Sequence, residues 1–117
     1  MKTELVTFAV KPGLEAEAET WMDMLRARRL ECVATLERER MRYESVFVSH
    51  REGRMYLTWF SVQAEGGSDL ADSRFEVDRL HLEFWDRCID PAVPPVVFEH
   101  VVSFAPEDVA EAVRGGG

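Results

Sequence analysis

Four stretches of the chain alternate between hydrophobic and polar positions or are continuously rich in β-branched and aromatic residues, which is typical of strands. They cover residues 3–10, 41–50, 54–62 and 96–104. The second and third are separated only by Arg-Glu-Gly at 51–53, a short connection with glycine at the turn. This connection predicts a β-hairpin.

Between these strands the hydrophobic period changes to three or four residues, which indicates amphipathic helices. One helix is expected from about 14 to 39, and its length suggests a bend near residues 28–31. A second is expected over 72–90, with Asp72 or Ser73 as its N-terminal cap.

The order strand–helix–strand therefore occurs twice, which is the βαββαβ order of the ferredoxin-like fold. We expect an α+β protein whose antiparallel sheet carries both helices on one face. Residues 1–105 would form this single domain, and residues 106–117 a short helical turn and a glycine tail.

Hydrophobic residues on both faces of the sheet suggest that the second face is also covered. Pairing His50 with Arg54 would put Phe47, Leu57 and Trp59 on one face. The opposite face would then carry Val46, Val48, Tyr56 and Phe60. Because two helices cover only one face, the simplest cover for the other is the same face of a second copy. The pattern thus predicts a homodimer.

Composition limits the kinds of partner. The 117 residues are 46% hydrophobic and 31% charged, with a formal net charge of -8. A chain of this charge repels phosphate backbones and anionic lipid surfaces, so neither nucleic acid nor a membrane is an expected partner. No apolar window of about 18 residues is present. Cys32 and Cys88 lack metal-ligand spacing and fit reduced thiols, which indicates a cytoplasmic protein.

Short motifs add a resemblance to this pattern. They are "VKPG" after the first strand, "TLERERMRYESVF" at the helix-to-strand junction, "GRMYLTWF" in the hairpin and "HLEFWDRCID" in the second helix. With the element order, they make residues 3–104 resemble the dimeric α/β-barrel superfamily of antibiotic-biosynthesis-type monooxygenases, and within it a family of small bacterial proteins. The superfamily also contains polyketide cyclases and haem-degrading relatives. The resemblance implies a pocket in each subunit, between the helices and the concave sheet.

His81 and Glu44 are the candidate catalytic residues. His81 and Trp85 are four residues apart and share one helix face. The imidazole would be an acid, a base or a ligand-orienting donor, or else a structural side chain at the core edge. Glu44 lies mid-strand with a covered face on either side, so it requires an ion-pair partner, a hydrogen bond or a proton. Glu39, at the end of a helix rich in charge, fits such a role less well.

Four further residues are candidates for ligand binding: Tyr56, Trp59, Trp85 and His100. Aromatic rings suit the walls of a pocket for a flat organic molecule, although stripes of this kind also form ordinary cores. His100 lies mid-strand, where it joins the pocket or the dimer interface according to the face it occupies.

Three hypotheses about the function remain open. The first is a protein that binds or transforms a small aromatic or polyketide-like molecule; as an enzyme it would be a monooxygenase, cyclase or isomerase. The second is a non-catalytic dimer that binds a metabolite or a protein. The third is a haem-binding member of the fold. No nucleotide, zinc-peptidase or hydrolase motif is present, so no cofactor and no metal are expected under the first hypothesis. If Glu44 and His81 share a pocket, the carboxylate should raise the pKa of His81 above about 6.5.

Overall fold

The structure, a computed structural model, describes residues 2–64 and 75–113. The strands are β1 (Lys2–Ala9), β2 (Met41–Arg51), β3 (Arg54–Gln63) and β4 (Val96–Val97). The helices are α1 (Glu15–Ala27), α2 (Arg29–Glu39), α3 (Glu76–Cys88) and α4 (Glu107–Val113).

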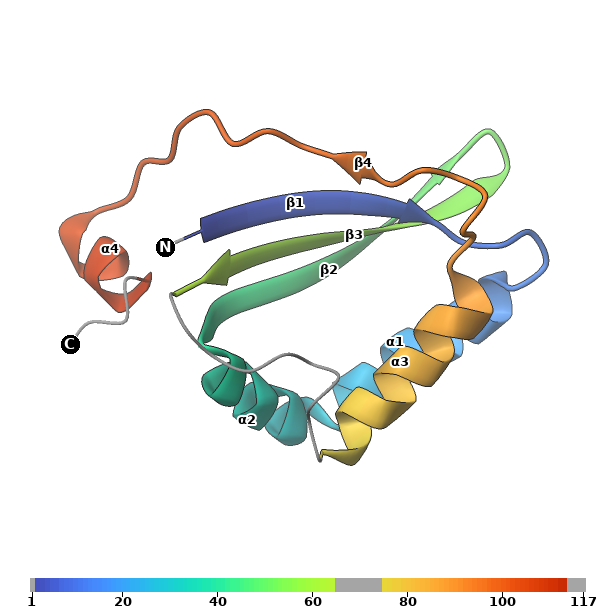
Figure 1. Cartoon of the computed structure of the whole chain (residues 1–117), viewed down its shortest axis with the longest axis horizontal. Helices are drawn as coiled ribbons and strands as arrows, with labels where there is room; N and C mark the ends of the chain where they lie inside the picture. The colour runs from blue at the N-terminus through green and yellow to red at the C-terminus, as the bar shows by residue number, and fades with distance from the viewer. Residues whose placement is uncertain (1, 65–74, 114–117) are drawn as a thin grey trace.

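The strands form one antiparallel sheet in the order β2-β3-β1-β4. Helices α1, α2 and α3 all lie on the same side of this sheet (Figure 1). The protein is therefore α+β, and its strand order and one-sided helices are compatible with the predicted ferredoxin-like plan. The predicted C-terminal helical turn is confirmed as α4.

The long helix expected over residues 14–39 is two helices. Arg28, with φ -107° and ψ 31°, separates α1 from α2, which confirms the bend expected there. Helix α2 ends at Glu39, and its C-cap Arg40, in the left-handed conformation (φ 57°), turns the chain directly into β2. For the helix expected over 72–90, the structure gives α3, and the proposed caps Asp72 and Ser73 lie outside the described residues.

The last strand is much shorter than predicted. Only Val96 and Val97 pair with β1, and Phe98 adds one further bond from its N–H to the carbonyl oxygen of Leu5 at 2.9 Å. Beyond this point, residues 99–104 are exposed and form no strand. The prediction of a strand over 96–104 is wrong, because its apolar side chains find no second surface to pack on among residues 2–64 and 75–113.

The hairpin register also differs from the prediction by one residue. Arg51 pairs with Arg54, and His50 pairs with Met55 rather than with Arg54. The turn is therefore only Glu52-Gly53, and both residues have positive φ (52° and 75°). A two-residue turn of this kind matches the twist of the flanking strands and requires the left-handed conformation that glycine adopts freely.

This register sets which side chains face the helices. Val46 pairs with Trp59 and Val48 with Leu57, so these four residues share the helix-covered face. The opposite face, called here the outer face, carries the alternate positions, including Phe47, Tyr56 and Phe60. The predicted face assignment was thus wrong for Phe47, which exchanges places with Val46 and Val48, because a one-residue slip inverts one strand relative to the other.

The core lies between α1, α3 and the sheet. Its fully buried members are Val10, Ala18, Trp21, Met55, Leu57, Phe84, Cys88 and Ile89. Phe8, Trp59 and Trp85 pack against this set, and the three tryptophans are in mutual ring contact. Rings at these separations fill the volume beneath α1 and α3.

The outer face of the sheet has no helical cover from α1, α2 or α3 (Figure 1). Tyr43 and Phe47 on this face are more than half exposed, as is Val96 at the end of the same face. The predicted second apolar face is therefore present in the structure.

Candidate active site

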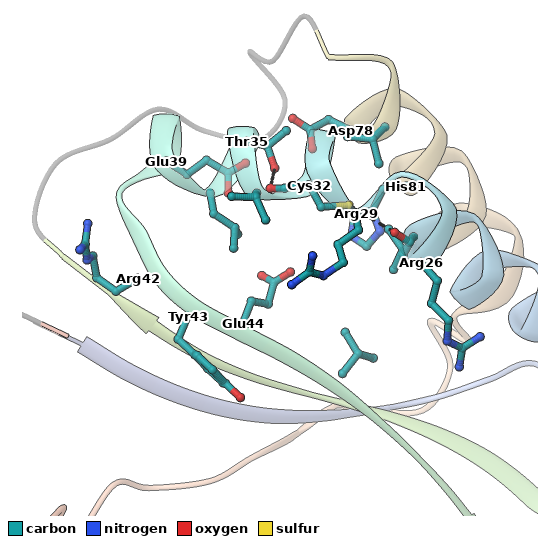
Figure 2. Close-up of a pocket in the computed structure, with 15 residues that line it drawn as sticks. Arg26, Arg29, Cys32, Thr35, Glu39, Arg42, Tyr43, Glu44, Asp78 and His81 are labelled. Atoms are coloured by element: carbon teal, nitrogen blue, oxygen red, sulfur yellow. Dashed lines mark hydrogen bonds between the residues drawn. The ribbon is translucent and has the colours of Figure 1, made fainter. Parts of the chain in front are cut away.

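A cavity of about 600 Å³ lies beneath α2, between β2 and the first turns of α3, and it opens to solvent (Figure 2). Its apolar wall is formed by Leu25, Val33, Leu36, Val46 and Val77. Its charged side chains are Arg26, Arg29, Arg42, Glu39, Glu44 and Asp78. His81, Cys32, Thr35 and Tyr43 complete the lining. An aliphatic wall with a few polar groups is the usual composition of a small-molecule site.

The junction of α2 and β2 brings two carboxyl groups to this cavity. Glu39 is the last residue of α2, and the left-handed Arg40 reverses the chain at once into β2. Arg42 is an extra residue in β2, where the register with β3 shifts, and Glu44 then pairs with Ser61 on the helix-covered face. Figure 2 shows the Glu44 carboxyl group directed from β2 toward the helices, and the Glu39 side chain running along α2 toward Thr35.

Helix α3 contributes Asp78 and His81 to the cavity, and a hydrogen bond to α2 fixes the position of α3. The carboxylate of Glu31 accepts a hydrogen bond from the backbone N–H of Val77 at 2.8 Å, in the first turn of α3. Arg28 lies 3.3 Å from Glu31 and 3.8 Å from Glu76, which neutralises the charge at this contact. A carboxylate at a helix N-terminus is favoured by the unpaired N–H groups there.

Two carboxyl groups of the cavity, those of Glu39 and Glu44, hold their protons more tightly than ordinary ones. Burial, and then the nearby Asp78 and Glu44 carboxylates, raise the pKa of Glu39 to about 7, against a smaller opposing effect of Arg38. The Oε1 atom of Glu39 is buried and accepts no hydrogen bond from the described residues. For Glu44, its recessed position and then Asp78 raise the pKa, although solvent still reaches the side chain through the open mouth.

The arginines around the cavity differ in their partners. Arg26 pairs with Asp23 at 2.6 Å, and Arg42 donates to the carbonyl oxygen of Ala112 at 3.2 Å. Arg29 projects into the cavity from the α2 side (Figure 2) and forms no ion pair with the described residues. Glu44 likewise has no ion-pair partner among them, so the structural ion pair considered for this residue is not found in the described chain.

The Cys32 thiol is not set up as a nucleophile. Burial, followed by Glu44 and Asp78, raises its pKa, so the thiol is protonated at neutral pH. It donates weakly to the carbonyl oxygen of Leu25 at 3.7 Å, and Thr35 donates to the Cys32 carbonyl oxygen at 2.8 Å.

His81 connects the cavity to the aromatic core. Its Nδ1 accepts a hydrogen bond from the indole Nε1–H of Trp21 at 3.0 Å, and its ring contacts Trp21, Trp59 and Trp85. Burial lowers the pKa of His81 to about 4. The prediction that Glu44 raises this pKa is therefore wrong: desolvation decides the charge of the ring, and the imidazole is neutral at pH 7.

The structure brings the two candidate catalytic residues to one cavity but not the four candidate ligand-binding residues. Trp59 and Trp85 pack against each other in the core, with ring centroids 5.2 Å apart. Tyr56 lies on the outer face beneath the Arg51 guanidinium, 5.0 Å from its ring centroid. His100 is exposed in the segment after β4, with its Nε2 at 2.7 Å from Ser103 Oγ.

Asp78 is a cavity residue that sequence reasoning missed. It is three positions before His81, so helical spacing alone places both on one face of α3. Its burial, at 5% exposure, depends on how α2 packs over α3, and no local pattern carries that information.

Within the described ranges, no group of three or more His, Cys, Asp or Glu side chains is arranged to hold a metal ion. None of the helices in residues 2–64 and 75–113 combines the length and the apolar character needed to cross a membrane. The fold and the cavity together define an α+β protein with a solvent-open, acid-rich pocket beneath its helices.

Comparison with known families places almost the whole chain in one family. Residues 1–111 match a family of unknown function, DUF6176, and the chain belongs to this family. No curated protein and no solved structure matches the chain significantly.

Proposed function

We propose that this protein binds a small organic molecule in the cavity beneath α2 and acts on it by acid–base chemistry, without a nucleotide cofactor. The observation that carries the proposal is that one solvent-open cavity contains both Glu44 and His81. A cavity filled by aromatic rings would have favoured a purely structural or protein-binding role, but the rings pack against one another in the core instead.

Acid–base catalysis requires groups that exchange protons near the working pH. Glu39, whose pKa is raised to about 7, supplies such a group, and the pKa of Glu44 is raised in the same direction. The neutral His81 supplies a hydrogen-bonding group that carries no charge. The apolar wall is aliphatic, and the ring of Tyr43 packs against Phe60 on the outer face, so a compact ligand with a hydrocarbon body suits the site better than a large flat one.

Binding is tested by filling the cavity. Val33 lines the cavity and is 43% exposed, so Val33→Trp blocks the space without disturbing the core. The matched control is Val109→Trp, at a 46% exposed position on α4 away from the cavity. A library of small neutral compounds is screened by NMR chemical-shift changes. Compounds that shift Val46 and His81 should lose binding in Val33→Trp and retain it in Val109→Trp.

Binding that persists in Val33→Trp would show that the cavity is not the site. Binding lost only in this variant, with no turnover of any bound compound, would favour the alternative of a non-catalytic metabolite-binding module.

We further propose a cytoplasmic homodimer of the dimeric α/β-barrel type, formed by contact between outer faces. The uncovered apolar residues of this face support it, and the free thiols of Cys32 and Cys88 fit a reducing compartment. Light scattering at micromolar concentration should give twice the chain mass of 13.4 kDa. Phe47→Asp should reduce this to the single-chain mass, because a carboxylate is costly to bury in such an interface. A wild-type monomer would contradict the dimer.

A further inference from the structure

The hydrogen bond between Trp21 and His81 determines which nitrogen of the imidazole carries the proton. Trp21 is fully buried, and its Nε1–H lies 3.0 Å from Nδ1 of His81. An indole nitrogen only donates hydrogen bonds, so Nδ1 must accept and cannot itself be protonated. The neutral ring therefore carries its proton on Nε2, and the doubly protonated ring is incompatible with this contact.

The Nε2–H group of His81 is available to a ligand in the cavity. His81 lines the cavity, and the described residues offer Nε2 no hydrogen-bond partner. Burial keeps the ring neutral, consistent with its lowered pKa. His81 thus presents a fixed, uncharged donor to whatever occupies the cavity, and this excludes it as the general base at neutral pH.

We propose that Trp21 is a positioning residue that holds His81 as an Nε2–H donor, and that this donor binds the carbonyl oxygen of a neutral substrate whose adjacent C–H is removed by Glu44. This inference rests on the proposed function and names its substrate class: a small aliphatic compound with an acidic C–H next to a carbonyl group.

The chemistry balances within the site. The Glu44 carboxylate forms an O–H bond with the proton, and the broken C–H bond supplies its electron pair to the new C=C bond of an enolate. The former carbonyl π pair moves to the oxygen, where the Nε2–H of His81 stabilises the developing charge. Return of the proton from Glu44 to the same carbon gives exchange, and return to a conjugated carbon gives isomerisation. No oxidant or reductant is consumed.

Charge in the cavity favours a neutral ligand over an anionic one. Glu39, Glu44 and Asp78 all line it; Asp78 raises the pKa of both glutamates, and Glu44 also raises that of Glu39. Of the three cavity arginines, Arg26 is paired with Asp23 and Arg42 is bonded to the α4 backbone. Arg29 projects into the cavity without an ion pair among the described residues, but it offsets only one of the three carboxyl groups. A ligand carboxylate beside Nε2 would therefore still meet like charge, whereas a carbonyl oxygen would not.

The tautomer is tested first, by two-dimensional ¹H–¹⁵N NMR of the histidine ring in the ligand-free protein. Wild type should show Nδ1 unprotonated and Nε2 protonated at pH 7. Trp21→Phe keeps a ring but removes the donor, so both tautomers should appear and the His81 pKa should rise by about one unit. The matched control is Trp85→Phe, since Trp85 contacts the His81 ring at 6.1 Å without bonding to it. The control should change neither property.

A protonated Nδ1 in wild type, or identical His81 spectra in wild type and Trp21→Phe, would overturn the positioning role. If Trp21→Phe does not fold, His81→Gln replaces it. The glutamine Oε1 accepts from Trp21 and its amide donates into the cavity, so the indole N–H resonance of Trp21 should stay shifted as in wild type. In His81→Leu that resonance should move to its unbonded position, and a resonance that is the same in all three proteins would overturn the contact.

The substrate class is tested with three probes that share one hydrocarbon body: cyclohexanone, cyclohexanecarboxylate and cyclohexylamine. Cyclohexanone should shift the Nε2 resonance of His81, and the protein should accelerate exchange of its α-protons in D₂O. Glu44→Gln should abolish the acceleration. His81→Leu should reduce it about a hundredfold, the usual effect of removing one donor to a developing oxyanion, and His81→Gln should restore most of it.

The outcomes separate the two proposals. If cyclohexylamine or the carboxylate binds and cyclohexanone does not, the cavity remains a small-molecule site but the carbonyl substrate class fails. If cyclohexanone binds without accelerated exchange, the enolate step fails and binding stands. If none of the three binds, the proposed function and the inference both fail for compact ligands of this kind.

Discussion

The helix-covered side of the sheet is filled at one end and hollow at the other. Beneath α1 and α3, the rings of Phe8, Trp21, Trp59 and Trp85 lie in mutual contact. Beneath α2, the corresponding space is a cavity whose wall includes Glu39, Glu44 and Asp78. The same sheet face therefore supports a dry core and an open pocket a few residues apart.

Side-chain size and charge explain this difference. Aromatic rings bury large areas and fill the volume between a helix and a sheet. Carboxyl groups are short and lose free energy when they leave water, so a layer that contains several of them packs less tightly and stays hydrated. His81 lies at the boundary, since its ring contacts three tryptophans while it also lines the cavity.

The largest expected effect comes from placing a charge in the filled end. Trp59→Asp removes a ring from the cluster and leaves a carboxylate against Trp21 and Trp85, which should cost several kcal/mol of the free energy of unfolding. Val33→Asp makes a similar chemical change at the exposed rim of the hollow end and should cost less than about 1 kcal/mol. Thermal melts of the two variants measure the contrast. Similar losses in both would mean that the two ends do not differ in packing.

The fold followed largely from local patterns, and its errors have identifiable physical causes. The alternation of β1 and the period of α1 and α3 gave the element order correctly, because each depends on which side chains face a single core. The hairpin register could not be read in this way, since residues 51–53 suit a two-residue or a longer turn equally well. The last strand was overestimated because Val101 and Phe104 have strand propensity, yet both side chains are exposed in the part of the chain that the structure describes.

The site was predicted only in part, for a different reason. Alternation placed Glu44 on the same face as Val46, and helical spacing directed His81 toward the core, so both could be found from periodicity. The aromatic walls could not be distinguished from core, because a tryptophan suits either environment. The sign of the His81 pKa shift depends on burial and on the contact with Trp21, which joins residues 60 positions apart.

The lowered pKa of His81 predicts a second, smaller effect, a dependence of the free energy of unfolding on pH. The unfolded chain binds a proton at this ring below about pH 6.5, whereas the folded protein does so only below about 4. Stability should therefore fall as the pH drops from 6.5 to 4, by about 3 kcal/mol from this residue. Denaturant titrations of wild type and His81→Gln across this range isolate the effect, since glutamine does not titrate. Parallel pH profiles of the two proteins would refute the neutral buried ring.

Glu39 should show the opposite pH dependence at the hollow end. Its folded pKa of about 7 lies above the ordinary 4.5, so the folded state binds the extra proton between these values. Stability is therefore lost as the pH rises from 4.5 to 7. Glu39→Gln removes this loss and should stabilise the protein at pH 8 by about 1 kcal/mol after solvent screening, with little change at pH 4.

The control for Glu39 is Glu37→Gln, an exposed position two residues earlier on α2. It should leave the melting temperature nearly unchanged at both pH values. An equal gain from both substitutions would assign the effect to the net charge of -8 rather than to the cavity.

The smallest expected effect is a null one, and it separates the two ends most directly. Glu44 and His81 line one cavity, yet the pKa of His81 is lowered by burial alone, and the Trp21 contact occupies its Nδ1. Glu44→Gln should therefore leave the His81 titration curve unchanged within about 0.2 units, as measured by NMR of the ring, because removing a screened charge across an open cavity alters little. Trp21→Phe in the same experiment should move the curve. If Glu44→Gln shifts the His81 titration curve instead, the cavity determines the charge of His81. The residue would then belong to the hollow end rather than to the filled end.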